Sequence, residues 1–144
     1  MSETPRLNRQ VCFALYSASK AATAVYRPVL DELGLTYPQY LVMLVLWESE
    51  PRSVRELGVE LGLDSGTLSP LLKRLESVGL VERRRSAEDE RRVEVHLSNA
   101  GRALSSRAKT VPQRLADSAG LSASELAQLH DTLGRLTAAL HSAI

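Results

Sequence analysis

The chain has 144 residues and a formal net charge of +1, with 18 Lys and Arg against 17 Asp and Glu. This length suits one domain, or a compact domain with helical arms, and gives no indication of a multidomain enzyme. Because the bulk charge is close to zero, an expectation of DNA binding has to rest on a local arrangement of residues.

No apolar run approaches the roughly 20 residues that span a bilayer, and the polar start MSETPRLNRQ lacks the apolar core of a signal peptide. We therefore expect a cytoplasmic protein without a membrane partner. The single cysteine, Cys12, cannot form an intrachain disulfide or a cysteine zinc site. The histidines show no ligand spacing: His96, His130 and His141. We expect neither a metal site nor a cofactor.

Apolar residues at steps of three and four predict a long first helix from Val11 to Leu33. Pro28 is expected to kink or break this helix, and Gly34 has the position of a helix C-cap. Thr36 then begins a second helix. The continuous apolar run in Leu41–Trp47 indicates a helix buried on most sides, with a buried strand as the alternative.

Two helices with a short turn between them are predicted next. Ser53 and Glu56 have the spacing of a capping box, so a short helix begins there and ends at Gly62. Another helix opens at Asp64 or Ser65 and ends at Gly79. Its apolar residues recur at helical spacing: Leu68, Leu71, Leu72, Leu75 and Val78. This arrangement is a candidate helix-turn-helix.

The hydrophobic period changes after Gly79. Val81 on one side, and Val93, Val95 and Leu97 on the other, alternate with polar neighbours, which predicts two short half-buried strands. The segment RRRSAEDERR between them is predicted to be a loop. A helix-turn-helix followed by a charged β-hairpin is the layout of a winged helix.

The remaining residues are predicted to be helical, with a break near Pro112 and a capping box of Ser122 with Glu125. The last helix carries a narrow apolar seam: Leu126, Leu129, Leu133, Leu136 and Leu140. Helical arms with such faces have to bury them, and a two-fold homodimer would do so. We predict a mainly α (α+β) fold, with one domain over residues 1–144. A winged helix at residues 51–98 would bind DNA, and helical regions at residues 7–50 and 99–144 would dimerise.

The second helix of a helix-turn-helix lies in the major groove with its N-terminal residues towards the bases. The candidate DNA-binding residues on this helix are Ser65, Thr67, Ser69, Pro70, Lys73 and Arg74. In the loop, Arg91 is the candidate for the adjacent minor groove, and Asp89 can orient its guanidinium. The alternative is a protein-binding module with a solvated charged loop.

Cys12 lies near the start of its predicted helix, where the positive end of the helix dipole favours a thiolate. Tyrosine hydroxyls can donate hydrogen bonds to that thiolate. The alternative is that Cys12 is a small buried hydrophobe. Tyr26 follows Cys12 by 14 residues, or about 21 Å along a straight helix. The two cannot meet within one chain, so a shared site needs two subunits whose first helices run past each other.

The segment LDSGTLSPLLKRLESVGLVERRRSAEDERRV resembles the recognition helix and wing of the MarR family of dimeric transcriptional regulators. The upstream segment QVCFALYSASKAATAVYRPVLDELGLTYPQYLVMLVLWE is similar to the organic hydroperoxide resistance regulators (OhrR) of that family. The resemblance implies a repressor that binds an inverted-repeat operator as a homodimer. An organic hydroperoxide would release it by oxidising Cys12, with Tyr26 and Tyr37 in contact with the cysteine. We place Tyr16 with them as a third supporting tyrosine.

Some members of this branch carry a second, resolving cysteine, whereas this chain has one. It therefore resembles the one-cysteine type, in which a low-molecular-weight thiol caps the sulfenic acid or oxidation proceeds further. Two alternatives stay open: a MarR-type repressor that responds to a small aromatic ligand, and a thiol peroxidase. The missing resolving cysteine and the winged helix count against the peroxidase, and we expect no enzyme.

Overall fold

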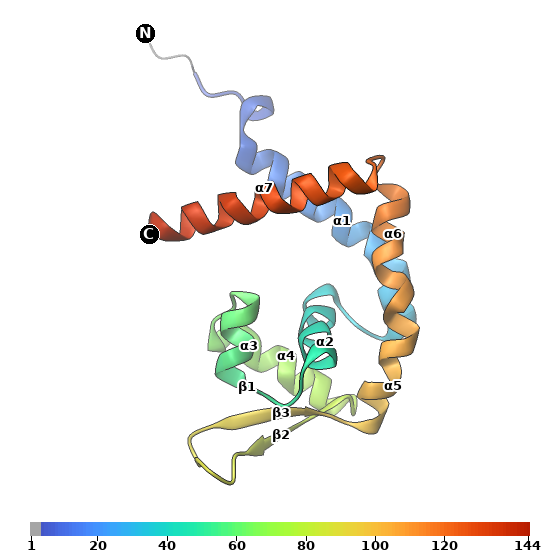
Figure 1. Cartoon of the computed structure of the whole chain (residues 1–144), viewed down its shortest axis with the longest axis vertical. Coiled ribbons are helices and arrows are strands. Elements are labelled where there is room, and N and C mark those ends of the chain that lie inside the picture. Colours follow the sequence, from blue (N-terminus) through green and yellow to red (C-terminus); the bar gives the residue numbers. More distant parts are fainter. Residues whose placement is uncertain (1–3) are drawn as a thin grey trace. The chain divides into compact units, whose positions relative to one another are not determined.

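A computed structural model describes residues 4–144 of the chain, which fall into two compact units. The first unit ends at Lys109 and the second spans Thr110–Ile144. The first contains η1 (Leu7–Arg9), α1 (Val11–Leu33), α2 (Tyr37–Glu48), α3 (Val54–Leu61), α4 (Ser65–Ser77), α5 (Asn99–Arg107) and three short strands (Figure 1). The second contains α6 (Val111–Ser118) and α7 (Ala123–Ser142), after the 3-10 turn η2 (Ala108–Thr110).

Helix α1 has the predicted bounds, but it continues through Pro28, so the expected break is absent. Its buried residues are Val29, Leu30 and Leu33, all in the last two turns, where α1 contacts α2. This packing, in the turns that follow Pro28, stabilises the helix despite the missing N–H of the proline. Gly34 ends the helix in the left-handed region, with φ of 72°.

Helix α2 forms the centre of the first unit. Thr36 and Gln39 make a reciprocal capping box, with hydrogen bonds of 3.4 and 3.0 Å. The apolar run that follows is helical, so the alternative of a buried strand is excluded. Its side chains supply much of the core: Tyr40, Val42, Met43, Val45 and Leu46 are all buried.

The predicted helix-turn-helix is confirmed as α3 and α4. The Ser53 hydroxyl caps α3 by accepting from the Glu56 amide at 3.0 Å, and the Asp64 carboxylate caps α4 by accepting from the Thr67 amide at 2.7 Å. The two helices pack against each other, and the buried leucines among their residues are Leu57, Leu68, Leu72 and Leu75. Val78, which continues the helical spacing of these leucines, is by contrast 62% exposed. Helix α4 ends at Ser77, and Val78 leaves the helical path, so the helical period no longer points it inward.

The predicted hairpin is also present, as strands β2 (Val81–Arg85) and β3 (Val93–Leu97). They pair antiparallel with Val81 opposite Leu97 and Arg85 opposite Val93. A third strand, β1 (Arg52–Ser53), pairs with the other edge of β3. We did not predict β1, because two residues are too few to show an alternating pattern.

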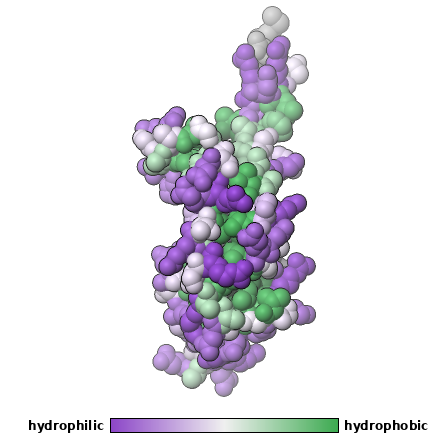
Figure 2. Space-filling view, turned by 90° about the vertical axis from the view of Figure 1, so that its right-hand side faces the viewer, coloured by the Kyte–Doolittle hydropathy of each residue, from purple (hydrophilic) through white to green (hydrophobic). Residues whose placement is uncertain are grey.

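The second unit begins with α6, whose first turn contains Pro112, close to the predicted break. A capping box of Ser122 and Glu125 then starts α7, as predicted. No residue of α7 is buried, and Leu129 and Leu140 of the predicted seam are 44% and 52% exposed. In the first unit, the N-terminal half of α1 likewise carries exposed apolar residues, and Figure 2 shows apolar residues at the surface between hydrophilic ones. Apolar helix faces are normally buried against another surface, whereas these faces of α1 and α7 are exposed in the single chain.

Candidate redox sensor and nucleic-acid interface

Cys12 lies in the first turn of α1, directly after Val11, and its thiol is exposed and free. Within the described structure no side chain caps this end of the 23-residue helix. The thiol therefore lies in the first turn, where the backbone N–H groups have no partner within the helix and the dipole has its positive end. Because Cys12 is exposed in the single chain, the alternative that it is a small buried hydrophobe is excluded there.

Tyr26 and Tyr37 form a stacked pair, with ring centroids 5.6 Å apart and an interplanar angle of 9°. The ring of Tyr40 lies 6.4 Å from Tyr26 and 6.3 Å from Tyr37. Partial burial, and then the neighbouring Tyr37 hydroxyl, raise the pKa of Tyr26 above its ordinary value. The Tyr26 hydroxyl is therefore protonated at neutral pH and is able to donate a hydrogen bond to an anion such as a thiolate.

Tyr16 occupies a different place from the stacked pair. It follows Cys12 by four residues on α1, so the two side chains share one face of the helix. Tyr16 is exposed, and the Lys20 ammonium lies 5.2 Å from its ring centroid. The structure thus separates the three predicted tyrosines: Tyr16 lies beside Cys12 of its own chain, whereas Tyr26 and Tyr37 lie together near the other end of α1.

The recognition helix α4 presents all of its predicted DNA-binding side chains to solvent. Ser65, Thr67, Ser69, Pro70, Lys73 and Arg74 are all exposed. Hydrogen bonding from the Thr67 amide lowers the pKa of the capping carboxylate, Asp64, so this cap stays charged at neutral pH. The charged cap fixes the first turn of α4, while the hydroxyl and basic side chains that follow remain unburied.

The wing between β2 and β3 is shaped by Asp89. Its carboxylate accepts a hydrogen bond from the backbone N–H of Arg91 at 3.0 Å, and its carbonyl oxygen accepts from the N–H of Arg92 at 2.9 Å. The expected contact of Asp89 with the Arg91 guanidinium is absent from the described structure. An aspartate readily bonds to the backbone two residues further on, and here that local bond takes the carboxylate.

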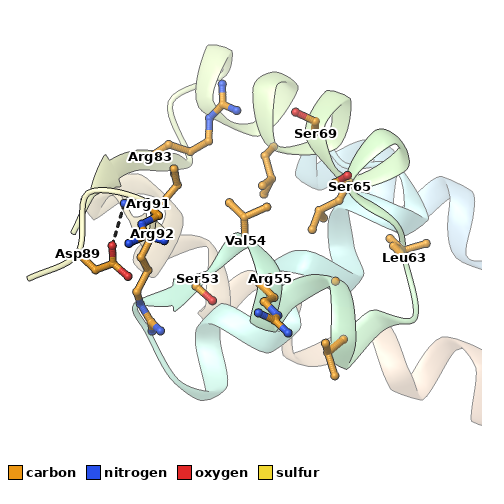
Figure 3. Close-up of a pocket in the computed structure, with 15 residues that line it drawn as sticks. Ser53, Val54, Arg55, Leu63, Ser65, Ser69, Arg83, Asp89, Arg91 and Arg92 are labelled. Atoms are coloured by element: carbon orange, nitrogen blue, oxygen red, sulfur yellow. Dashed lines mark hydrogen bonds between the residues drawn. The ribbon is translucent and has the colours of Figure 1, made fainter.

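A groove of about 840 Å³ lies between α3, α4 and the wing. Figure 3 shows Ser65 and Ser69 of α4 on one side and Asp89 and Arg91 of the wing on another. The structure therefore brings four of the predicted DNA-binding residues to one groove. The other four lie on α4 outside its lining: Thr67, Pro70, Lys73 and Arg74.

The groove also contains Arg55, which we did not predict as a site residue. Arg55 lies in the first turn of α3, two residues after its cap, and is exposed. Two other arginines of the lining are paired: Arg92 with Glu56 at 2.6 Å, and Arg83 with Glu76 at 3.2 Å. Within residues 4–144, the guanidinium groups of Arg55 and Arg91 make no ion pair. The sequence signal that could have identified Arg55 was its position in the first turn of the first helix of the helix-turn-helix.

Two further properties concern the part of the chain that the structure describes. None of its helices is long and apolar enough to cross a membrane. Residues 4–144 contain no group of three or more His, Cys, Asp or Glu side chains placed to hold a metal ion.

A winged helix with an exposed recognition helix and unpaired arginines beside it defines the class of helix-turn-helix transcriptional regulators. Comparison with known proteins agrees, because the family model of the transcriptional regulators SarA/Rot matches residues 24–108. The organic hydroperoxide resistance transcriptional regulator of Bacillus subtilis (strain 168) is 45% identical over 136 residues, which cover 94% of this chain and 92% of that protein. The chain therefore belongs to the MarR/SarA family of transcriptional regulators, in the branch of the organic hydroperoxide resistance regulators.

Solved structures of AbfR, a protein of Staphylococcus epidermidis, give the same fold. Reduced AbfR bound to DNA matches with a TM-score of 0.76 and 35% identity, over 94% of each chain. Overoxidised AbfR bound to DNA matches with a TM-score of 0.77 and 33% identity, over 94% of this chain and 95% of AbfR. These matches confirm the predicted fold class and the family resemblance.

Proposed function

We propose that this protein is a peroxide-sensing repressor that binds operator DNA as a homodimer and is released when an organic hydroperoxide oxidises Cys12. The observation that carries the proposal is the placement of two partial sites at opposite ends of α1. An exposed thiol lies in the first turn, and the stacked rings of Tyr26 and Tyr37 lie beside the later turns. The similarity to regulators named for organic hydroperoxide resistance supports the same conclusion.

A homodimer completes both sites at once. If the α1 helices of two subunits run antiparallel, Cys12 of one chain meets Tyr26 and Tyr37 of the other, although about 21 Å of helix separates Cys12 from Tyr26 within a chain. The exposed apolar faces of α1 and α7 supply surface for such an interface. In this arrangement the helical regions at residues 7–50 and 99–144 dimerise, and the winged helix at residues 51–98 binds DNA.

The chemistry requires only the thiolate and the peroxide. The sulfur of Cys12 attacks one peroxide oxygen, so an S–O bond forms and the O–O bond breaks. The sulfur is oxidised to a sulfenic acid, and the peroxide is reduced to an alcohol after the leaving alkoxide takes a proton. A tyrosine hydroxyl that donates to the thiolate also holds it in the reactive, deprotonated form. A low-molecular-weight thiol can then condense with the sulfenic acid, with loss of water, or a second peroxide can oxidise it further.

Oxidation reaches the DNA through the dimer. The two recognition helices of a dimer have to fit successive major grooves, about 34 Å apart. A sulfenic acid or mixed disulfide at the interface adds bulk and changes the hydrogen bonds that hold the two α1 helices. A rotation of the subunits then moves the α4 helices away from this spacing, and the affinity for the operator falls.

The test uses Cys12→Ser and an inverted-repeat duplex selected from random DNA by the reduced wild-type protein. Both proteins should bind the duplex, and a stoichiometric organic hydroperoxide should release only the wild type while mass spectrometry detects one added oxygen on Cys12. Release of Cys12→Ser by the peroxide would exclude the sensor role. Sustained peroxide consumption with a small-molecule reductant, without specific DNA binding, would favour a thiol peroxidase. Release by a small aromatic compound alone would favour a ligand-responsive repressor.

A further inference from the structure

The tyrosine pair is the beginning of a longer series of aromatic contacts. Tyr40 touches both Tyr26 and Tyr37, with centroid distances of 6.4 and 6.3 Å. On its other side, Tyr40 meets the ring of Trp47 edge to face, at 6.4 Å and 65°. We call these four residues, Tyr26, Tyr37, Tyr40 and Trp47, the aromatic chain. All four contact distances lie in the range of favourable aromatic pairs.

The aromatic chain ends at the base of the wing. The Trp47 indole N–H donates a hydrogen bond of 2.8 Å to the carbonyl oxygen of Gly101, a buried residue of α5. Gly101 in turn lies directly against the backbone of Leu80, since a Cβ atom at position 101 would be 2.2 Å from the Leu80 carbonyl oxygen. That carbonyl also accepts from the N–H of Ser98 at 3.0 Å. Leu80 precedes β2 and Ser98 follows β3, so β2 begins and β3 ends at this point.

We propose that Trp47 is a positioning residue that couples the state of Cys12 to the orientation of the wing, through the aromatic chain and Gly101. The inference rests on the proposed function, because it requires Tyr26 and Tyr37 to change partners when Cys12 is oxidised. Packed rings cannot shift singly without opening voids, so a displacement of the tyrosine pair moves Tyr40 and Trp47. The hydrogen bond from the Trp47 indole then passes that displacement to Gly101 of α5. Gly101 has no side chain, so its backbone lies directly against the backbone of Leu80 at the base of the wing.

The structure offers a matched control for this hydrogen bond. The Arg107 guanidinium also ties α5 to another helix by one bond to a carbonyl oxygen, that of Glu32 in α1, at 2.9 Å. Arg107 is not in the aromatic chain. Trp47→Phe removes the indole donor and keeps an aromatic ring, whereas Arg107→Met removes a comparable bond of α5 elsewhere.

The experiment measures the operator Kd of each full-length protein, reduced and after stoichiometric organic hydroperoxide, and takes the ratio of the two. Trp47→Phe should keep its reduced-state Kd within about threefold of the wild type, while the ratio falls about tenfold, within the usual range of coupling between sites. Arg107→Met should keep the wild-type ratio. An unchanged ratio in Trp47→Phe, or an equal fall in Arg107→Met, would overturn the role of Trp47. Failure of the peroxide to release the wild type would instead remove the proposed function, and this inference with it.

A second measurement avoids any folding defect of the variant. Trp47 is the only tryptophan of the chain, so its fluorescence in the wild type reports this one position. The emission should shift when peroxide releases the protein from the operator, and it should stay constant in Cys12→Ser. Release of the wild type without a change in Trp47 emission would overturn the inference.

Discussion

Tyr26 and Tyr37 stack almost in parallel, with planes 9° apart, although one comes from the C-terminal half of α1 and the other from the first turn of α2. Their chain reverses at Gly34, whose left-handed backbone lets α2 fold back along the end of α1. The pair is therefore assembled within one subunit, whereas Cys12 lies 14 residues before Tyr26 on the same helix. In the function proposed above, this separation requires a second subunit to complete the sensor.

Mixed dimers test whether the site forms between subunits. One subunit carries Cys12→Ser and the other carries Tyr26→Phe with Tyr37→Phe. In a site formed between subunits, the remaining Cys12 faces the intact tyrosines of the Cys12→Ser chain. The initial rate of sulfenic acid formation per thiol should then equal that of the wild type. The measurement is mass spectrometry of Cys12 in tag-purified heterodimers after short exposure to an organic hydroperoxide.

The homodimer of Tyr26→Phe with Tyr37→Phe is the control for the mixed dimer. Its Cys12 lacks both hydroxyl donors, so it should react about 10-fold to 100-fold more slowly, as expected when positioned donors are lost from a reacting anion. Equal, slow rates in this homodimer and in the mixed dimer would show that each Cys12 depends on the tyrosines of its own chain.

Arg55 and Arg91 flank the groove without an ion-pair partner in the described structure, which predicts contacts with the DNA backbone. Because a homodimer contains each residue twice, Arg55→Gln should reduce the slope of log K against log salt by about 2. The loss of affinity should be the same for the operator and for random duplex DNA. Arg91→Ala should in addition lower the preference for the operator, if Arg91 enters the minor groove. Fluorescence anisotropy titrations at several salt concentrations measure both quantities.

Arg135 on α7 provides the control for these titrations, since it is exposed and belongs to the second unit. Arg135→Gln removes the same charge and should leave the salt slope unchanged. A slope that falls equally in Arg135→Gln would mean that net charge, rather than the groove, determines the effect.

The role of Asp89 is predicted to lie in the backbone of the wing, because its carboxylate accepts from the N–H of Arg91. Asparagine keeps an oxygen at this position, whereas alanine does not. Asp89→Asn should therefore retain operator affinity better than Asp89→Ala, for which we expect a loss of roughly 10-fold from a disordered wing. Equal losses in the two variants would indicate that the negative charge matters, as it would if Asp89 oriented the Arg91 guanidinium in the DNA complex.

Much of the fold was predictable because its boundaries depend on local chemistry. Gly34 and Gly62 adopt the left-handed conformation that ends a helix, and Asp64 and Ser122 cap the next amide groups as their spacing predicts. The alternation of apolar and polar residues in β3 likewise predicted which of its side chains are buried. Each of these signals lies within a few residues of the feature it determines.

The features that we missed depend on contacts between distant parts of the chain. Strand β1 exists because its two residues meet β3, about 40 positions later, and Trp47 finds its acceptor at Gly101, 54 residues away. Neither pairing leaves a periodic pattern in the sequence. The partner of the Asp89 carboxylate was missed for another reason, since a side chain with two possible partners nearby gives no sign of which one it binds. The sequence alone could likewise name the candidate tyrosines without showing that two of them stack.

Glu50 connects α2 to the wing and to α5, and it predicts a pH-dependent stability. Its carboxylate accepts from both Nε and Nη2 of Arg102, at 3.0 and 2.9 Å, and from the Leu97 amide at 3.2 Å. The hydrogen bond from Arg102 holds the pKa of Glu50 below its ordinary value; partial burial opposes this effect and the Leu97 amide adds to it. A carboxyl whose pKa is lower in the folded state stabilises the fold above its unfolded pKa, of about 4.3. That contribution is lost as the pH falls through the folded pKa.

Glu50→Gln should therefore lower the free energy of unfolding by about 1 kcal/mol at neutral pH. The difference from the wild type should shrink as the pH falls below about 4, where the wild-type carboxyl also becomes protonated. Urea unfolding followed by circular dichroism measures this, at one fixed protein concentration because a dimer's stability depends on it. Glu48→Gln is the control, since Glu48 is exposed at the end of α2 and makes no ion pair within residues 4–144; it should change the free energy by less than about 0.5 kcal/mol. If Glu50→Gln lowers the free energy of unfolding equally in acid and at neutral pH, the effect comes from altered packing, because protonation of the wild-type carboxyl would then not change the difference.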